Sequence, residues 1–267
     1  MGTYAHHYKI VTSLFMALLM PLGAVAQEAA LSPLKLNARY NIAWNGITLG
    51  RINITADESE TAYSLIADTK TRGIAVVISD ERSVALAQGS KRGPDSYIPA
   101  RYESRPQEGG EARTTLLTYD ADGNLASRTR TPDDDPSWRP VVPPAQINRA
   151  HDPITAAFML RRTAYAALAR NQQAVSTTTY DGARLAEMTF ARTANMPMTV
   201  LGKEVDTIDL AVTRKPLNGY TPKELKKYKK GDPAIHLYFT NDAAFTPVRA
   251  TAATPLGELS MTLVRTN

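Results

Sequence analysis

The chain of 267 residues contains no cysteine. This absence excludes disulfides, thiolate nucleophiles and metal sites with cysteine ligands. It also excludes the lipid-bearing cysteine of a bacterial lipoprotein. The fold must therefore be held together by its core alone.

Residues and motifs that carry common chemistries are also scarce. The chain has only four histidines. It contains no Gly-x-Ser-x-Gly elbow, no glycine loop for phosphate and no histidine pair at metal spacing. We therefore predict no catalytic residues, no bound metal and no cofactor.

One long apolar run is present, close to the N-terminus. Residues 10–20 are mostly apolar, they follow a polar stretch that ends in Lys9, and they precede Ala24-Val25-Ala26. This pattern predicts a secretory signal peptide over residues 1–26, cleaved after Ala26, and a periplasmic location. The alternative is a permanent membrane anchor, which needs about 20 apolar residues, and Pro21 interrupts this run. The cleaved chain is not expected to span a membrane.

The charge balance is mildly basic. Removing 26 of the 267 residues leaves 241 and lowers the net charge from +5 to about +4 because Lys9 is lost. So small an excess over that length does not indicate a nucleic-acid partner. The remaining length suits one large domain or two small ones, and we expect a single β-rich domain over residues 27–267.

Most of the chain after the signal has the pattern of β-strands. Apolar and polar residues alternate from Tyr40 to Trp44 and again from Ile47 to Leu49. Between them, Asn45-Gly46 tolerates the positive φ angles of a type I′ turn, which predicts a hairpin. The same alternation recurs at Tyr63–Ala67, Ala186–Phe190, Ile208–Val212, Ile235–Phe239 and Leu259–Leu263.

Turn residues separate these runs, so the connections should be antiparallel. The turns are expected at Asp120–Asn124, Asp181-Gly182, Asn241-Asp242 and Leu256-Gly257. About ten or more strands in one sheet twist strongly, and closing or wrapping the sheet removes its exposed edges. We therefore predict a mainly β fold, either a curled antiparallel sheet or a partly open β-barrel, that wraps one long α-helix.

The helix is expected over residues 153–169. Asp152 can cap its free N–H groups, and Pro153 suits the first helical position. Before it, the segment Thr131–Pro144 contains five prolines and Asp133-Asp134-Asp135. This segment is expected to be an irregular, exposed crossing with a solvated acidic loop, because the run lacks the spacing of a calcium loop.

The two histidines beyond the signal have simple structural explanations. His151 precedes the helix cap, and capping accounts for Asp152 without catalysis. His236 alternates out of phase with Ile235 and Leu237 and should lie on the opposite face of its strand. We expect a surface or pocket histidine there.

A lysine-rich segment, Thr221–Asp232, is predicted to be the tip of a basic hairpin. Its lysines could simply keep an edge soluble, or they could contact anionic envelope material such as lipid head groups. The lysines of this candidate binding site are Lys223, Lys226, Lys227, Lys229 and Lys230.

Four segments carry a resemblance to a known family. They are Tyr40–Arg51, His151–Arg161, Tyr180–Arg184 and Leu237–Arg249, the last followed by Gly257. With these segments the chain resembles the DUF3108 family of bacterial exported proteins. The resemblance implies a periplasmic, β-rich envelope protein with no established catalytic residues, similar to the β-spiral envelope integrity proteins and loosely to lipoprotein carriers. Some β-spiral relatives have a cysteine pair, and the lack of cysteine here means that no disulfide role is carried over.

These observations favour binding over catalysis. A curled sheet around a helix can leave an apolar crevice for a lipid or another apolar ligand. The main hypothesis is a periplasmic protein that supports the cell envelope by binding such a ligand or an envelope partner. The alternative from another class is an envelope hydrolase with an unrecognised active site near His151 or His236.

Overall fold

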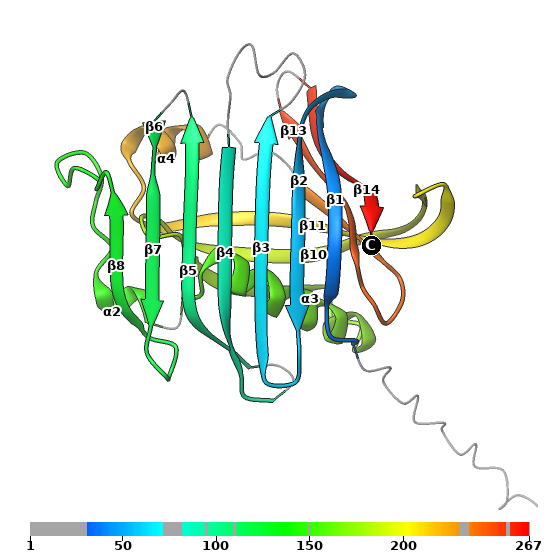
Figure 1. The fold of residues 1–267 in the computed structure, drawn as a ribbon, viewed down its shortest axis with the longest axis horizontal. Coiled ribbons are helices and arrows are strands. Elements are labelled where there is room, and N and C mark those ends of the chain that lie inside the picture. The colour runs from blue at the N-terminus through cyan, green and yellow to red at the C-terminus, as the bar shows by residue number, and fades with distance from the viewer. Residues whose placement is uncertain are drawn as a thin grey trace, which may run out of the picture. The chain divides into compact units, whose positions relative to one another are not determined.

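In the computed structural model, β-strands occupy most of the chain (Figure 1). The structure describes residues 31–71, 82–93, 96–108, 111–148, 150–229, 235–254 and 257–266. The predicted signal peptide, with its cleavage after Ala26, lies outside these residues, and so does Lys230. The described residues belong to one compact unit that starts at Leu31.

The strands form one antiparallel sheet. They are β1 (Lys35–Trp44), β2 (Ile47–Glu58), β3 (Ala62–Thr71), β4 (Arg82–Lys91), β5 (Tyr97–Glu108), β6 (Glu111–Ala112), β7 (Thr114–Tyr119), β8 (Leu125–Thr131), β9 (Ala174–Tyr180), β10 (Leu185–Val200), β11 (Lys203–Asn218), β12 (Ile235–Thr240), β13 (Pro247–Thr254) and β14 (Gly257–Thr266).

The sheet has 14 strands in the order β8-β7-β5-β4-β3-β2-β1-β14-β13-β12-β11-β10-β9, and β6 pairs with β5. The first and last strands therefore lie side by side in the middle, while β8 and β9 form the two edges. These edges are not hydrogen-bonded to each other among the described strands, so the sheet is not closed into a barrel.

The first hairpin confirms the turn prediction and shows how the sheet obtains its two faces. Asn45 and Gly46 have φ angles of 46° and 82°, as a type I′ turn requires. In β1, Tyr40 is fully buried while its neighbours Arg39 and Asn41 are only half-buried. Alternate residues thus face the core and the outside.

Three helices accompany the sheet in the described chain: α2 (Pro144–Ile147), α3 (Pro153–Ala169) and α4 (Pro222–Lys229). The helix expected over residues 153–169 is α3, and the Asp152 carboxylate accepts hydrogen bonds from the N–H groups of Ile154 and Thr155. It contacts β9, β5, β4 and β10. The described sheet is antiparallel and open, and the described helices are few and short. The expected arrangement of a sheet wrapped around one long helix is therefore wrong.

Aromatic contacts join α3 to the sheet. The ring of Phe158 lies 5.2 Å from that of Tyr63 and 6.0 Å from that of Tyr97. Farther along the helix, Tyr165 contacts Phe245, which stacks on Phe239. These large side chains fill the space beneath the sheet, and each buried aromatic contributes about 1.5–3 kcal/mol to folding.

Two local expectations differ from the structure. Residues 132–143 are irregular as predicted, but Arg139 and Val142 are buried, so this crossing is not exposed along its whole length. The lysine-rich segment begins with a helix, α4, and not with a hairpin tip.

No helix in the described part of the chain has the length and apolar character needed to cross a bilayer.

Candidate functional site

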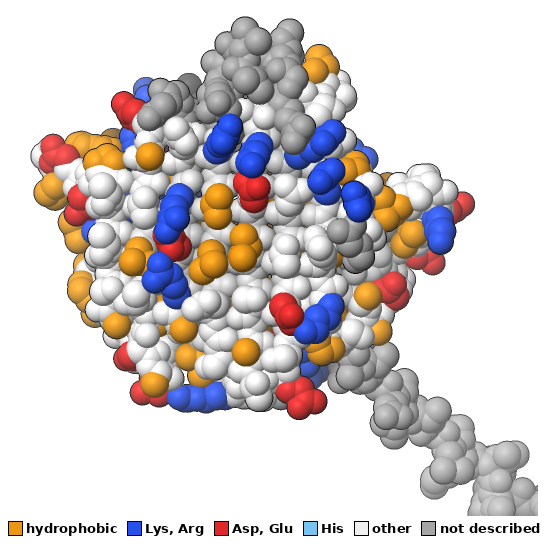
Figure 2. Space-filling model, viewed as in Figure 1, with side chains coloured by type: hydrophobic (Ala, Val, Ile, Leu, Met, Phe, Trp, Pro, Cys, Tyr) orange, Lys and Arg blue, Asp and Glu red, His pale blue; other side chains and the backbone are white. Residues whose placement is uncertain are grey.

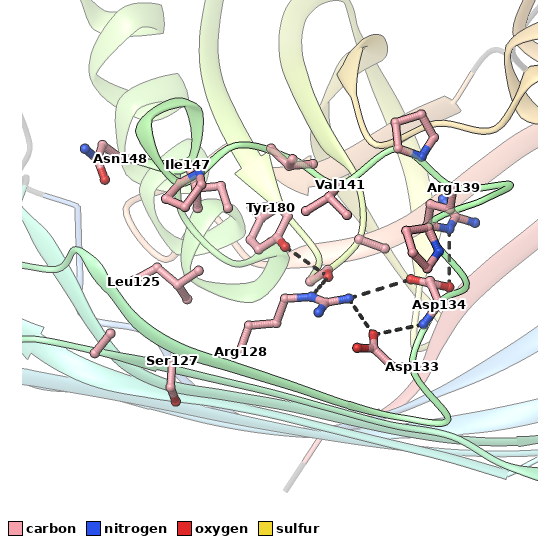
Figure 3. Close-up of a pocket in the computed structure, with 17 residues that line it drawn as sticks. Leu125, Ser127, Arg128, Asp133, Asp134, Arg139, Val141, Ile147, Asn148 and Tyr180 are labelled. Carbon is pink, nitrogen blue, oxygen red and sulfur yellow. Dashed lines mark hydrogen bonds and ion pairs between the residues drawn. The ribbon is translucent and has the colours of Figure 1, made fainter.

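A pocket of about 410 Å³ lies where the two edges of the sheet approach each other (Figure 3). One wall is β8, the second is the irregular crossing together with α2, and the third is the turn between β9 and β10. Arg128 of β8 donates from Nε to the carbonyl oxygen of Gly182 in that turn. We call this place the seam pocket.

Much of the lining of the seam pocket is apolar. Leu125 begins β8, Val142 lies at the end of the crossing, and Ile147 ends α2. Val142 and Ile147 are buried, whereas Val141 at the rim is 73% exposed. Prolines of the crossing add rigid apolar surface, because a proline ring fixes its backbone φ angle. The pocket therefore offers a preformed apolar surface with an open side.

The polar wall is made of ion pairs that neutralise one another. Arg128 lies 2.9 Å from Asp133 and 3.8 Å from Asp134, and Arg130 also bonds to Asp134. Arg139 reaches the same Asp134 carboxylate at 3.3 Å. Asp133 and Asp135 are exposed, as expected for a solvated acidic loop, whereas the Asp134 side chain is only 11% exposed and holds the crossing against β8. Since these charges are already paired, the wall has little free charge for an ionic ligand.

Arg139 links the pocket to α4. Its guanidinium donates to the carbonyl oxygen of Gly219 at 2.7 Å and lies 3.0 Å from the Glu224 carboxylate. Burial raises the pKa of Glu224, but the hydrogen bond from Arg139 and the charge of Arg184 outweigh it and bring the pKa to about 2. Glu224 also accepts from the Thr221 N–H, whose hydroxyl accepts from the Glu224 N–H. This reciprocal capping box explains why the segment is helical.

The close approach at Gly219 provides a stability prediction. Gly219 has φ of 78°, and a Cβ there would lie 2.0 Å from the carbonyl oxygen of Ala183. Gly202 has a similar φ of 79° but nothing within 4 Å. Both glycine-to-alanine changes should cost about 1–2 kcal/mol for the left-handed backbone, and G219A should cost about 2 kcal/mol more through the clash. Equal unfolding free energies for G219A and G202A would contradict this close approach.

A second polar cluster surrounds the start of α3. Asp152 is fully buried, and its carboxylate accepts from the N–H groups of Ile154 at 3.0 Å and Thr155 at 2.9 Å. The Thr155 hydroxyl donates to the second carboxylate oxygen and lies 2.7 Å from the hydroxyl of Tyr63. The cluster therefore fixes the helix start to β3.

Asp152 should make folding stability depend on pH. Burial raises its pKa from 3.8 to about 6, against the opposing effect of its hydrogen bonds. The protonated carboxyl therefore favours the folded state, and this contribution, about 3 kcal/mol at most, is lost as the pH rises through about 6. The D152N change would keep the helix cap but remove the titrating group. We expect the stability difference between D152N and the unchanged protein to grow between about pH 4 and pH 7, and a constant difference in urea unfolding would contradict it.

His151 has a structural role in the described chain. Its backbone N–H donates to Thr178 and its carbonyl oxygen accepts from Tyr180, which ties the segment before α3 to β9. Burial lowers the pKa of the imidazole, and a hydrogen bond to the backbone of Tyr97 opposes this. Its Nδ1 is buried and has no hydrogen-bond partner among the described residues. Among the described residues, no serine or threonine hydroxyl forms a hydrogen bond with the His151 imidazole that could activate it as a nucleophile.

His236 lies on the face of β12 opposite to Leu237 and Phe239, as predicted, since those two pack in the core. Its Nδ1 lies 2.9 and 3.0 Å from the two carboxylate oxygens of Asp209, and the Thr193 hydroxyl donates to the same carboxylate at 2.6 Å. In a hydrolase of the Ser-His-Asp type, the nucleophilic hydroxyl is bonded to the histidine. Here the Thr193 hydroxyl is bonded to the Asp209 carboxylate instead, so these three residues do not have the arrangement of a Ser-His-Asp triad.

The predicted lysine site is placed on α4. Lys223, Lys226 and Lys229 are exposed, while the side chain of Lys227 and all of Lys230 lie outside the described residues. The helix is anchored through Glu224, so its lysines stand on a fixed support beside the wall of the seam pocket. Contact of these lysines with anionic envelope material stays a prediction.

The residues that build the seam pocket were not identified from the sequence as a site. One usable signal was Thr221-Pro222-Lys223-Glu224, which has the spacing of a capping box and a proline at the first helical position. The pairing of Arg128 with Gly182 had no such signal. It depends on the approach of two segments that are 54 residues apart.

Comparisons with known proteins identify a matching family and a solved structure with a similar fold. A family model described as "Protein of unknown function (DUF3108)" matches residues 39–264. No curated protein matches the chain. A solved beta-barrel-like protein of the domain of unknown function DUF1849 from Brucella abortus is similar, with 12% identity, a TM-score of 0.51, and coverage of 89% of this chain and 98% of that one. The protein CT021 from Chlamydia trachomatis has 9% identity, a TM-score of 0.33 and coverage of 86% and 87%.

Proposed function

The chain belongs to the DUF3108 family of proteins of unknown function, and from this premise we propose that it is an exported, non-catalytic protein that supports the cell envelope by binding an apolar ligand. The ligand class is a lipid or another molecule with an acyl-like apolar part. The seam pocket is its binding site.

The observation that carries this proposal is the contrast between the two walls of the seam pocket. Its apolar wall gains by excluding water, at about 25 cal/mol for each Å² buried. Its polar wall is engaged in ion pairs with Asp133 and Asp134 and in a bond to Gly182. A charged ligand would have to displace these pairs, whereas an apolar ligand would not. A volume of about 410 Å³ lies in the usual range of ligand pockets.

Export is supported by the sequence before the described residues. The polar start, the apolar run and Ala24-Val25-Ala26 have the arrangement of a signal peptide, and the proposed cleavage follows Ala26. The described helices offer no membrane-spanning segment. An exported protein without cysteine does not depend on the oxidising conditions outside the cytoplasm for its fold.

Native mass spectrometry tests the proposal. The protein is expressed from its full sequence, recovered gently from the periplasm and measured without denaturation. We expect a bound mass of lipid size that is released in organic solvent, together with a polypeptide mass that starts at Gln27. A population that is free of any adduct and that also takes up no added fatty acid or phospholipid would contradict the proposal.

A further inference from the structure

The outer face of the sheet, opposite to the core, carries two rows of cross-strand neighbours on β14, β1, β2, β3, β4 and β5. The first row is Thr262, Asn41, Arg51, Lys70, Arg82 and Gln107. The second row is Arg265, Arg39, Asn53, Asp68, Val84 and Arg105. Six of these twelve residues are Arg or Lys and one is acidic, and Figure 2 shows blue cationic side chains distributed over this face. We call it the basic face.

Several cations of the basic face stand directly opposite one another. Arg51 pairs with Lys70, Lys70 pairs with Arg82, and Arg39 pairs with Arg265. Like charges opposite each other destabilise an antiparallel sheet. The described chain neutralises the cations of this face only in part. Lys70 lies 3.7 Å from Asp68, and Arg105 pairs with Glu103, which lies on the same face opposite Leu86, while Arg51 and Arg82 have no acidic partner among the described residues. Folding alone does not explain this arrangement.

Apolar side chains lie exposed among these cations. Val84 belongs to the second row and is 41% exposed. Ile66 on the neighbouring strand β3 is 44% exposed and faces the same side, because it lies two residues from Asp68. Leu86, directly opposite Ile66, extends this patch and is half-buried. Figure 2 shows orange side chains at the centre of the face with blue ones around them.

We propose that the basic face docks on an anionic lipid bilayer. Arginine and lysine match the phosphate groups of the lipid surface, and Ile66 and Val84 reach the boundary of the acyl region. A soluble polyanion would satisfy the cations but would leave the apolar patch in water. The inference is independent of the seam pocket, which is lined by β8, the second strand beyond β5 in the sheet. The seam pocket is tested separately, by a bound mass.

Two triple variants of the full-length protein test the cations with an equal change in net charge. R51Q/K70Q/R82Q neutralises the basic face, and K223Q/K226Q/K229Q neutralises the lysines of α4. Each cation near an anionic surface strengthens binding about fivefold. The pair of variants separates this proposal from the competing prediction that the lysines of α4 contact anionic lipid. Under this proposal the first variant binds vesicles of phosphatidylcholine and phosphatidylglycerol about a hundredfold more weakly at low salt, and the second binds as the unchanged protein does. An equal loss in both, a loss only in the α4 variant, or no loss in either overturns the proposal.

The unfolding transition separates docking from a role in folding. Removing like charges that face each other should leave the R51Q/K70Q/R82Q protein as stable as the unchanged protein, or more stable. Weak vesicle binding together with a lowered stability would overturn the proposal, because a damaged sheet would then explain the loss.

The apolar patch distinguishes a bilayer from a soluble polyanion. In I66T/V84T the branching at Cβ is kept, while apolar atoms are lost and a hydroxyl is gained at each position. We expect binding to the anionic vesicles to fall about tenfold and binding to soluble polyphosphate to stay unchanged. Equal effects on vesicles and polyphosphate, or none on vesicles, overturn the proposal.

Discussion

Replacing Glu58 by glutamine is expected to lower the free energy of unfolding by about 3–5 kcal/mol. The Glu58 side chain is fully buried at the end of β2. Its carboxylate bonds to Lys91 Nζ at 2.6 Å and accepts from the Leu34 N–H at 2.9 Å and from the Tyr97 hydroxyl. It thereby joins the ends of three strands and the segment before β1.

The reason for so large an effect is the positive charge left behind. Besides the pairing with Lys91, Arg161 and Arg162 of α3 lie 3.6 and 3.7 Å from the carboxylate. Glutamine keeps the size of the side chain but leaves these cations in a buried site without a counter-charge. Burial raises the pKa of Glu58, but Lys91 and Tyr97 outweigh it and lower the pKa. The stability that it contributes is thus present at neutral pH and is lost on acidification below its ordinary value of 4.5.

Asp57 provides the matched control in the adjacent position. It pairs with Lys35, but both side chains are more than half exposed. Exposed ion pairs contribute about 0–1 kcal/mol, so D57N should unfold at nearly the same urea concentration as the unchanged protein. Similar small effects of E58Q and D57N would show that the buried cluster does not hold the fold together.

Replacing Leu125 by aspartate should abolish ligand binding in the seam pocket. Figure 3 shows Leu125 on the β8 wall of the pocket, apart from the paired Arg128, Asp133 and Asp134. A carboxylate there has no cation partner of its own, and burying it against an apolar ligand costs about 3 kcal/mol. Affinity for a fatty acid or phospholipid should therefore fall about a hundredfold, and the bound mass in native mass spectrometry should disappear.

Met196 serves as the control for this change. It lies on the long β10–β11 hairpin, is 41% exposed and does not line the seam pocket. M196D changes the net charge by the same amount, and its bound mass should persist. L125N provides a neutral check if the aspartate affects folding, and it should weaken binding less. Equal ligand occupancy in L125D and M196D would place the ligand elsewhere.

The parts of the fold that depend on neighbouring residues could be predicted from the sequence. Asn45-Gly46 forms its turn and Asp152 caps its helix because each acts on a backbone within a few residues of itself. The lysine-rich segment is a helix and not the predicted hairpin tip, because its local capping residues determine its structure and its charge does not. Thr221 and Glu224 were sufficient to indicate a helix there.

The candidate sites depend on pairings between distant segments. The basic face results from the register of β1 with β14 and of β2 with β3, since only that register sets Arg39 opposite Arg265 and Arg51 opposite Lys70. A shift by one residue would turn these side chains to the other face. The burial of Glu58 likewise requires Lys91 and α3 to be in place. Sequence alone gives the residue types but not these neighbours.

The pairing of β1 with β14 has a consequence for how the chain is assembled. Tyr40 donates from its hydroxyl to the carbonyl oxygen of Pro247, 207 residues later. A chain that crosses a membrane with its N-terminus first presents β1 long before β14 has emerged. Until then the two halves of the sheet have no strand to join them, and β1 offers an unpaired edge to other chains. Such late, distant pairing makes folding slow, and an exported chain of this design would depend on protection of β1 during its passage.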